Sequence, residues 1–155
     1  PYKSTQYAVL VLSDNSDINS VDDLAGKNVA VQSGSTGPEV VGKFAPEAEI
    51  QEFSKDDECR AALEQGRVDA YVVDNTLQMG NVVKNPGKYR IAGDAFGPEE
   101  YLGIGVKLGN TDAVDFINAF LKKFEDDGNW EKLYKIAVAD RCGIDTIPEP
   151  PAIGA

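Results

Sequence analysis

The first hundred positions alternate between short apolar runs and stretches with helical spacing. Gln6–Leu12 is almost continuously apolar and Val68–Val73 is largely so, which is typical of strands buried on both faces. Together with shorter apolar runs they give the predicted strands, which cover Gln6–Leu12, Asn28–Gln32, Glu49–Phe53, Val68–Val73, Tyr89–Ala92 and Tyr101–Val106.

Helices are predicted between these strands. Pro38 suits the first position of a helix, and Asp74 or Asn75 suits the cap of another. The predicted helical segments cover Val21–Leu24, Pro38–Phe44, Lys55–Gln65 and about 75–84. Alternation of strands and helices favours an α/β domain with a largely parallel five-stranded sheet flanked by helices.

After residue 106 the pattern becomes purely helical. Apolar residues recur at helical spacing from Val114 to Phe124 and again from Trp130 to Val138, and Gly128 separates the two segments. A proline-rich tail follows from Ile147. The last third therefore reads as two amphipathic helices and a tail.

Composition narrows the possible functions. The 155 residues amount to about one domain, and 15 basic against 26 acidic residues give a net charge of −11. Such acidity argues against nucleic acid and anionic membrane surfaces as partners. The chain has no histidine, which excludes histidine-based nucleophile systems, histidine metal ligands and an imidazole base. No metal or cofactor is expected, and no apolar run approaches the ~20 residues that a membrane span needs.

The loop Gln32–Pro38 follows a predicted strand and opens a predicted helix. Free N–H groups at a helix N-terminus favour an anion, and Ser35 and Thr36 add hydroxyl donors. The loop lacks the lysine of a Walker motif, so a carboxylate fits better than a triphosphate. An ordinary capped turn is the simpler interpretation, and on these residues alone it is favoured.

Asp74 lies just past the predicted strand Val68–Val73. Ligands of open α/β sheets collect outside the carboxyl ends of strands, so Asp74 is expected at the same edge as Ser35 and Thr36. Hydroxyl donors and one acid would together suit a zwitterion. The alternative is that Asp74 only caps the helix after it, which is the more frequent role of such a residue.

The two cysteines, Cys59 and Cys142, are too few and too far apart for a zinc cluster. One disulfide or two free thiols would equally explain the pair. The sequence leaves both open.

Four segments occur in an order and spacing that resemble a known family. They are DDLAGKNVAVQSGST, CRAALEQGRVDAYVVDN, YLGIGVKLGN and INAFLKKFEDDGNWEKLYK, and they span about residues 22–135. The ordered set resembles the amino-acid-binding group of type 2 periplasmic binding proteins, the solute-binding components of ABC importers. Each segment alone would be a weak signal.

The resemblance implies two α/β lobes that close on a ligand. Residues 8–100 would form the second lobe, and 1–7 and 101–106 would be the crossover segments. Residues 107–155 would supply the closing helices and tail of the first lobe. The N-terminal part of that lobe, ~90–100 residues, would be absent.

Carried over residue by residue, the resemblance assigns Gln32, Ser35 and Thr36 to the ligand's α-carboxylate or side chain and Asp74 to its α-ammonium group. The family's carboxylate-binding arginine belongs to the absent part. Some relatives pair a cysteine at the site of Cys59 with one near Asn28–Gln32, and here only Cys142 could be its partner.

The resemblance implies a binding protein, not an enzyme. Its ligand would be a polar amino acid, most simply glutamate, glutamine or aspartate, and its partner the membrane permease of an ABC importer. It would be periplasmic or extracellular, with a lipid anchor in the full-length precursor as an option. The alternatives are a small dehydratase on the same fold and a truncated lobe acting as an interaction module. A truncated chain would also be expected to self-associate or exchange elements between copies.

Overall fold

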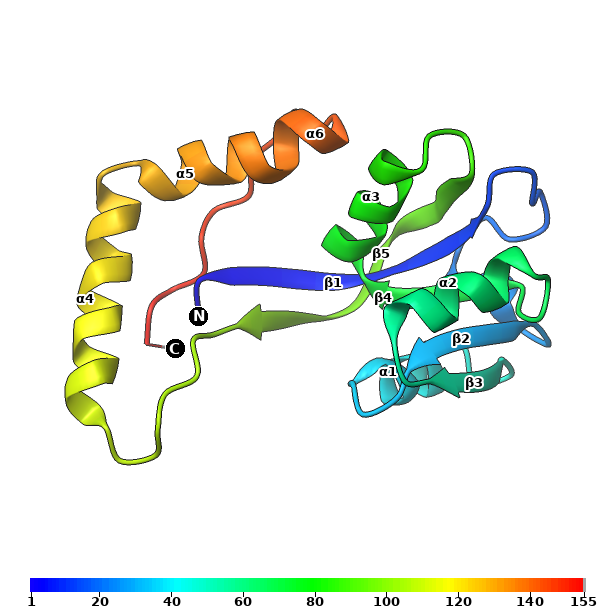
Figure 1. The fold of residues 1–155 in the computed structure, drawn as a ribbon, viewed down its shortest axis with the longest axis horizontal. Helices are drawn as coiled ribbons and strands as arrows, with labels where there is room; N and C mark the ends of the chain where they lie inside the picture. Colours follow the sequence, from blue (N-terminus) through cyan, green and yellow to red (C-terminus); the bar gives the residue numbers. More distant parts are fainter. Residues whose placement is uncertain (155) are drawn as a thin grey trace. The chain divides into compact units, whose positions relative to one another are not determined.

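The computed structural model describes residues 1–154 and divides into two compact units (Figure 1). One unit is Gln6–Pro98. The other combines Pro1–Thr5 with Glu99–Ala155. The expectation that residues 8–100 form one lobe of a two-lobed protein stays a prediction. Each unit is described by itself below.

A five-stranded sheet is central to the fold, with the strand order β3-β2-β4-β1-β5. The strands are β1 (Lys3–Leu12), β2 (Asn28–Gln32), β3 (Glu49–Phe53), β4 (Ala70–Asp74) and β5 (Tyr89–Leu102). β2 is parallel to β3 and β4, whereas β1 is antiparallel to β4. The predicted parallel pairing is confirmed for β2, β3 and β4, and β1 adds an antiparallel strand that the sequence did not predict. A strand covered on both faces is continuously apolar in either direction, so the pattern could not distinguish the two.

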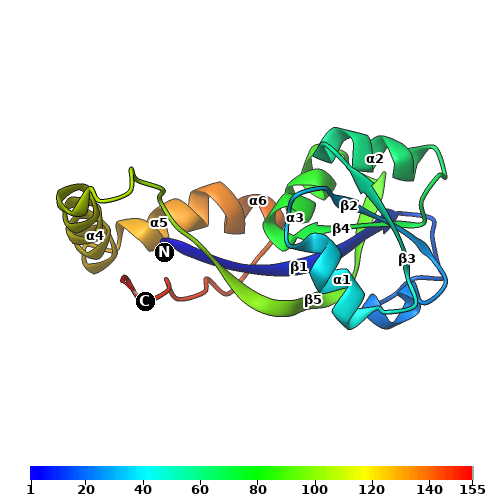
Figure 2. The same ribbon diagram turned by 90° about the horizontal axis from the view of Figure 1, so that it is seen from below.

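Helices α1 (Gly37–Phe44) and α2 (Asp56–Glu64) cover opposite faces of this sheet (Figure 2). Alternate residues of the strands enter two separate cores. The core under α1 includes Tyr7, Val9, Val11, Val29, Val31, Val40, Val41, Ala70 and Val72. The core under α2 includes Leu10, Ala30, Cys59, Ala62, Leu63, Tyr71, Val73 and Tyr89.

The remaining elements of this unit begin at side-chain caps. Ser20 and Asp23 form a capping box at the 3-10 helix η1 (Val21–Leu24). Asp74 caps α3 (Asn75–Lys84), as one of the sequence alternatives held.

One strand prediction was wrong. Tyr89–Ala92 and Tyr101–Val106 were expected as separate strands, but a single strand, β5, spans Tyr89–Leu102 and residues 103–106 have no regular structure. Gly93, Gly97 and Pro98 interrupt the apolar pattern between the two predicted strands. In the structure β5 is an edge strand of the sheet, where proline and glycines with a positive φ are tolerated.

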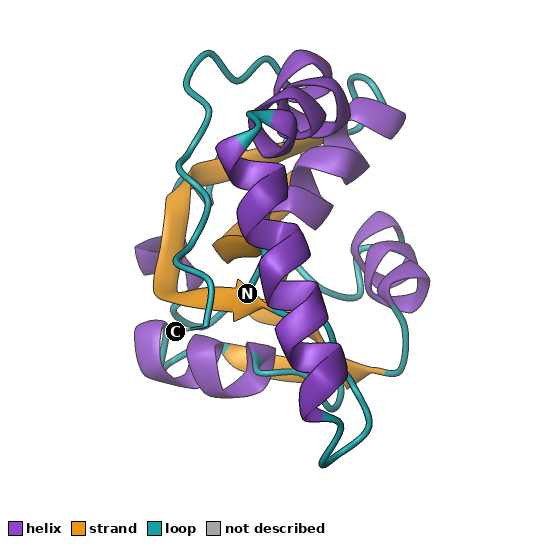
Figure 3. Ribbon diagram, turned by 90° about the vertical axis from the view of Figure 1, so that its left-hand side faces the viewer, coloured by secondary structure: helices purple, strands orange, loops and turns teal. Residues whose placement is uncertain are grey.

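The unit made of Pro1–Thr5 and Glu99–Ala155 is mainly helical (Figure 3). Its helical segments are α4 (Thr111–Asp126), α5 (Asn129–Tyr134), the π-helix η2 (Lys135–Ala139) and α6 (Asp140–Cys142). Gly128 separates α4 from α5 in the left-handed conformation that favours glycine, as its position suggested.

An apolar groove of about 770 Å³ lies within this helical unit. Residues of the N-terminal segment and of α4, α5 and η2 line it, among them Tyr2, Ile104, Phe120, Phe124, Leu133 and Val138. The helices thus leave part of their apolar faces open.

Both cysteines are free thiols, so the disulfide that the sequence left open is not formed. Cys59 is fully buried in the core under α2, and Cys142 is half-buried in the helical unit. A bridge would have to reach into a packed core.

Candidate functional site

Parallel pairing of β2 with β4 places the predicted site residues at one edge of the sheet. The carboxyl ends of adjacent parallel strands meet at the same edge. β2 ends at Gln32, directly before the loop 33–36, and β4 ends at Asp74. The structure therefore brings the loop and the acid to a common edge.

The loop after β2 is held by its own hydrogen bonds. Ser35 Oγ donates to the Gln32 carbonyl at 2.7 Å and accepts from Gly37 N at 3.1 Å. Gly34 has a φ of 73°, which an L side chain rarely adopts. These contacts engage the Ser35 hydroxyl inside the turn, so its first role is to shape the loop.

Thr36 is the N-cap residue of α1 and is exposed. Its carbonyl accepts from Val40 N at 3.1 Å, but its side chain makes no capping bond to the helix. The Thr36 hydroxyl is instead hydrogen-bonded to the hydroxyl of Tyr7 on β1. Thr36 thus presents a hydroxyl at the positive end of the helix dipole.

Asp74 is half-buried at the start of α3. Its Oδ1 accepts from Thr76 N at 2.8 Å and from Leu77 N at 3.1 Å. Neither bond engages Oδ2. The capping role is therefore real, and one carboxylate oxygen is not used by it.

Gln32, the last residue of β2, is half-buried. Its carbonyl accepts from the Ser35 hydroxyl, which ties the end of the strand to the turn. The four residues predicted from the sequence therefore all lie at the sheet edge or in the loop that leaves it.

Tyr7 is a residue of this edge that sequence reasoning missed. It is directly opposite Asp74 in the antiparallel β1–β4 register, and its hydroxyl bonds to Thr36. Residues in direct register project to the same face of a sheet. A tyrosine directly before the aliphatic run of β1 was the available signal, because a buried phenol needs a hydrogen-bond partner.

The arrangement combines hydroxyl and helix N-terminal donors with one carboxylate. Donors at a helix N-terminus favour an anion, and a carboxylate favours an ammonium group. The edge can therefore recognise the two charged groups of a small zwitterion.

Known proteins with similar sequences share one kind of function. The chain is 34% identical over 138 residues to the glutamate-binding protein GluB of Corynebacterium efficiens. It is 37% identical over 127 residues to the ABC transporter glutamine-binding protein GlnH of Bacillus subtilis. These alignments cover 85% and 81% of this chain. The chain is a homologue of amino-acid-binding proteins of ABC transporters.

The homologues are longer than this chain, which spans about half of their length, 47% of GluB and 46% of GlnH. No family model matches the chain.

Solved structures agree on the fold. An ancestral arginine-binding protein bound to glutamine superimposes with a TM-score of 0.77 at 37% identity, over 88% of this chain and 60% of that one. A solute receptor for L-cysteine of Neisseria gonorrhoeae superimposes with a TM-score of 0.82 at 25% identity, over 98% of this chain and 62% of that one. The resemblance to type 2 periplasmic binding proteins and the α/β fold class are thereby confirmed.

Proposed function

We propose that this chain supplies one side of an amino-acid-binding site in the solute-binding component of an ABC importer. The observation that supports it is the placement of Thr36 and Asp74 at one edge of the sheet, where Tyr7 is in register with Asp74 and hydrogen-bonded to Thr36. The names of the homologues, which bind glutamate and glutamine, point to the same class of ligand.

The α-carboxylate would bind at the N-terminus of α1. There the Thr36 hydroxyl and the positive end of the helix dipole both favour an anion. Ser35 would contribute by holding the turn in shape, since its hydroxyl is engaged by Gln32 and Gly37. The side chain of Gln32, at the end of β2, would face the ligand's side chain or carboxylate.

The α-ammonium group would bind Asp74. Oδ1 holds the first turn of α3, and Oδ2 is the oxygen that an ammonium group would contact. A charge-assisted hydrogen bond of this kind contributes about 1.5–3 kcal/mol.

The ligand would be a polar amino acid, with glutamate, glutamine and aspartate as the first candidates. The homologues that bind glutamate and glutamine support this choice. Both α-groups are common to all amino acids, so the side chain must be selected elsewhere in the site.

The membrane permease of the importer would be the protein partner, and the location periplasmic or extracellular, with a lipid anchor in the precursor as an option. Within residues 1–154, no helix combines the length and the apolar character that crossing a bilayer requires.

We also propose that residues 8–100 form one lobe of the binding protein, that 1–7 and 101–106 cross between lobes, and that 107–155 belong to the other lobe.

Asp74→Asn tests the site. Asparagine caps a helix as well as aspartate does, so the variant removes the charge and keeps α3 capped. Binding of L-glutamate and L-glutamine, measured by calorimetry on the protein at its full native length, should weaken at least about tenfold.

Asp69→Asn is the matched control. It removes the same charge beside the other end of β4, where Asp69 Oδ2 accepts from Asn28 N at 2.8 Å. Its affinity for both amino acids should stay close to that of the wild type. Equal affinities for Asp74→Asn and the wild type would reject the role of Asp74.

A small dehydratase on the same fold remains the alternative activity. One similar structure, at 29% identity and a TM-score of 0.73, is an ancestral amino-acid-binding protein described as a precursor of cyclohexadienyl dehydratase. That protein is itself a binder. Turnover of a cyclic carboxylic acid that Asp74→Asn abolishes would favour the enzyme.

A further inference from the structure

The Tyr7 side chain connects the two groups that the proposed function assigns to the ligand. Its Cα is in register with Asp74, and its hydroxyl is hydrogen-bonded to Thr36 Oγ1. Tyr7 itself is only 5% exposed, whereas Thr36 is exposed. A buried group therefore holds the hydroxyl of an exposed residue, Thr36, at the start of α1.

Packing fixes the Tyr7 ring. Its centroid lies 6.3 Å from that of Phe96, and Phe96 in turn lies 5.9 Å from Phe44 in an edge-to-face arrangement. These distances are typical of favourable aromatic pairs. The phenol oxygen thus has a defined position before any ligand arrives.

Gly97 brings β5 close to this ring. Its φ is 84°, and a Cβ built there would lie 3.1 Å from Val40 Cγ1 and 3.5 Å from Tyr7 Cδ2. Gln6 Nε2 donates to the Gly97 carbonyl at 3.0 Å. The strand is therefore held against Tyr7 where only a glycine fits without strain.

An exposed threonine hydroxyl can otherwise take several rotamers and point its proton in several directions. Thr36 makes no side-chain capping bond that would select one rotamer. The bond to Tyr7 is the contact that can select it. If the phenol donates, the Thr36 proton is left to donate to a ligand oxygen.

We propose that Tyr7 is a positioning residue that orients the Thr36 hydroxyl for a carboxylate ligand. This inference rests on the proposed function for the identity of the ligand, but the orientation of Thr36 can be tested without one. Tyr7 prepares the site by reducing the conformational freedom that Thr36 would otherwise lose on binding.

The first experiment needs no ligand. Three-bond couplings to the Thr36 methyl carbon report its χ1 rotamer in solution. The wild type should populate one rotamer, and Tyr7→Phe, which removes only the hydroxyl, should average over several. Averaging in the wild type, or one unchanged rotamer in Tyr7→Phe, would overturn the inference whatever the protein binds.

The second experiment uses L-glutamine and its α-amide as probes, by calorimetry on the protein at its full native length. Tyr7→Phe should weaken binding of L-glutamine about three- to tenfold and binding of the α-amide less, because only the former has an α-carboxylate. In a Thr36→Val background Tyr7→Phe should have no further effect.

The outcomes separate the two proposals. Additive losses from Tyr7→Phe and Thr36→Val, or equal losses for the two probes, would make Tyr7 merely structural. If Tyr7→Phe makes the Thr36 side chain average over several rotamers but the wild type binds neither probe, the positioning role is kept and the amino-acid ligand is rejected. Thermal unfolding midpoints close to that of the wild type show that both variants fold.

Discussion

Asp74 caps α3 through Oδ1 and lies opposite Tyr7 through the register of β1 and β4. From the sequence these looked like competing interpretations, a helix cap or a ligand group. The structure makes them compatible, because both capping bonds converge on one oxygen. A helix cap also fixes the carboxylate in place, so the structural role supports the proposed binding role.

Among the single residues, Cys59 is also expected to be chemically inert. Burial, and after it the negative charge of Asp56, raises the pKa of its thiol to about 11, and the side chain is fully buried. Only the thiolate reacts with alkylating reagents. Iodoacetamide at pH 7.5 should therefore leave Cys59 unmodified in the native protein.

Cys142 provides the internal comparison, since it is half-buried. Mass spectrometry of the alkylated protein should find modification at Cys142 first, and at Cys59 only after unfolding in urea. Labelling of Cys59 at the rate of Cys142 in the native protein would contradict this.

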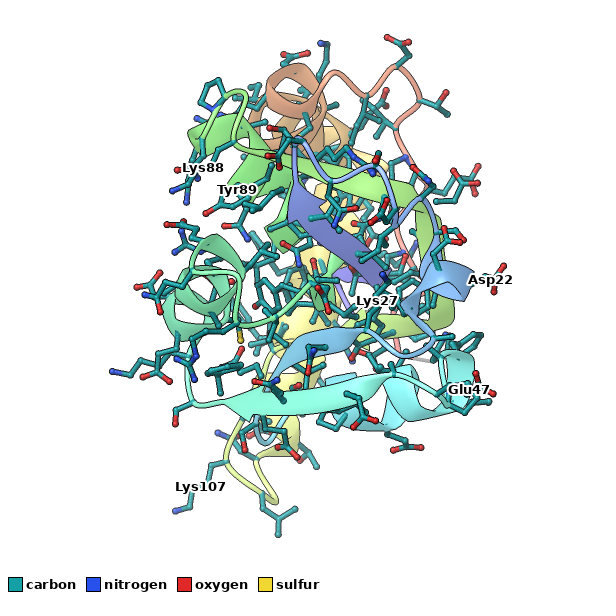
Figure 4. The ribbon with its side chains drawn as sticks, turned by 90° about the vertical axis from the view of Figure 1, so that its right-hand side faces the viewer. Asp22, Lys27, Glu47, Lys88, Tyr89 and Lys107 are labelled. Atoms are coloured by element: carbon teal, nitrogen blue, oxygen red, sulfur yellow. The ribbon has the colours of Figure 1, made fainter. Side chains whose placement is uncertain are left out.

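Among the elements, α2 is fastened to the start of β5 by a polar cluster. Glu64, the last residue of α2, accepts from the Tyr89 hydroxyl and pairs with Lys88 Nζ at 2.8 Å. Figure 4 shows Lys88 and Tyr89 next to each other at the edge of the unit. The hydrogen bonds from Lys88 and from Tyr89 lower the pKa of the Glu64 carboxyl.

This cluster predicts acid sensitivity. A carboxyl whose pKa is lower in the folded state stabilises the fold above its unfolded pKa of about 4.3, and this stabilisation is lost as pH falls through the folded value. Glu64→Gln should therefore reduce stability at pH 7 and lose less stability than the wild type between pH 5 and pH 3. Urea midpoints at several pH values measure this.

Glu47→Gln is the control, because Glu47 is an exposed glutamate of the same unit (Figure 4). It should follow the pH dependence of the wild type. The same slope for Glu64→Gln and the wild type would show that the cluster carries no pH-dependent stability.

At the scale of the whole molecule, the large apolar side chains with the highest exposed fractions among the described residues lie in the helical unit. Phe116 is 74% exposed, Ile136 61%, Leu133 57% and Phe120 56%. Phe120 and Leu133 also line the groove of about 770 Å³, and exposed apolar surface of this kind usually marks an interaction site.

We expect copies of this chain to associate through that surface when they are studied on their own. Light scattering should give a mass above the 16.7 kDa of one chain, rising with concentration. Phe116→Ser combined with Ile136→Ser should reduce the association. Val83→Ser removes an apolar side chain that is 42% exposed in the other unit and should not. A mass of one chain at every concentration would contradict the expectation.

The sequence by itself determined most of the local structure. β2 and β3 have the bounds that their apolar patterns predicted, and α1, α2 and α3 differ from the predictions by a residue or so at their ends. The spacing of apolar residues, the caps and the glycines are sufficient to predict these elements. Each element buries one face, and its own sequence shows the period at which the buried residues recur. The loop with Ser35 and Thr36 and the acid Asp74 could be found for the same reason.

Tertiary structure decided what depends on residues far apart in the chain. It set the antiparallel direction of β1, joined two predicted strands into β5, and brought Tyr7 to Thr36 across 29 positions. Periodicity tells which face of a strand is buried but not which strand lies beside it or in which direction. The hydrogen bond between Tyr7 and Thr36 exists only once that pairing is made, and so no local pattern could reveal it.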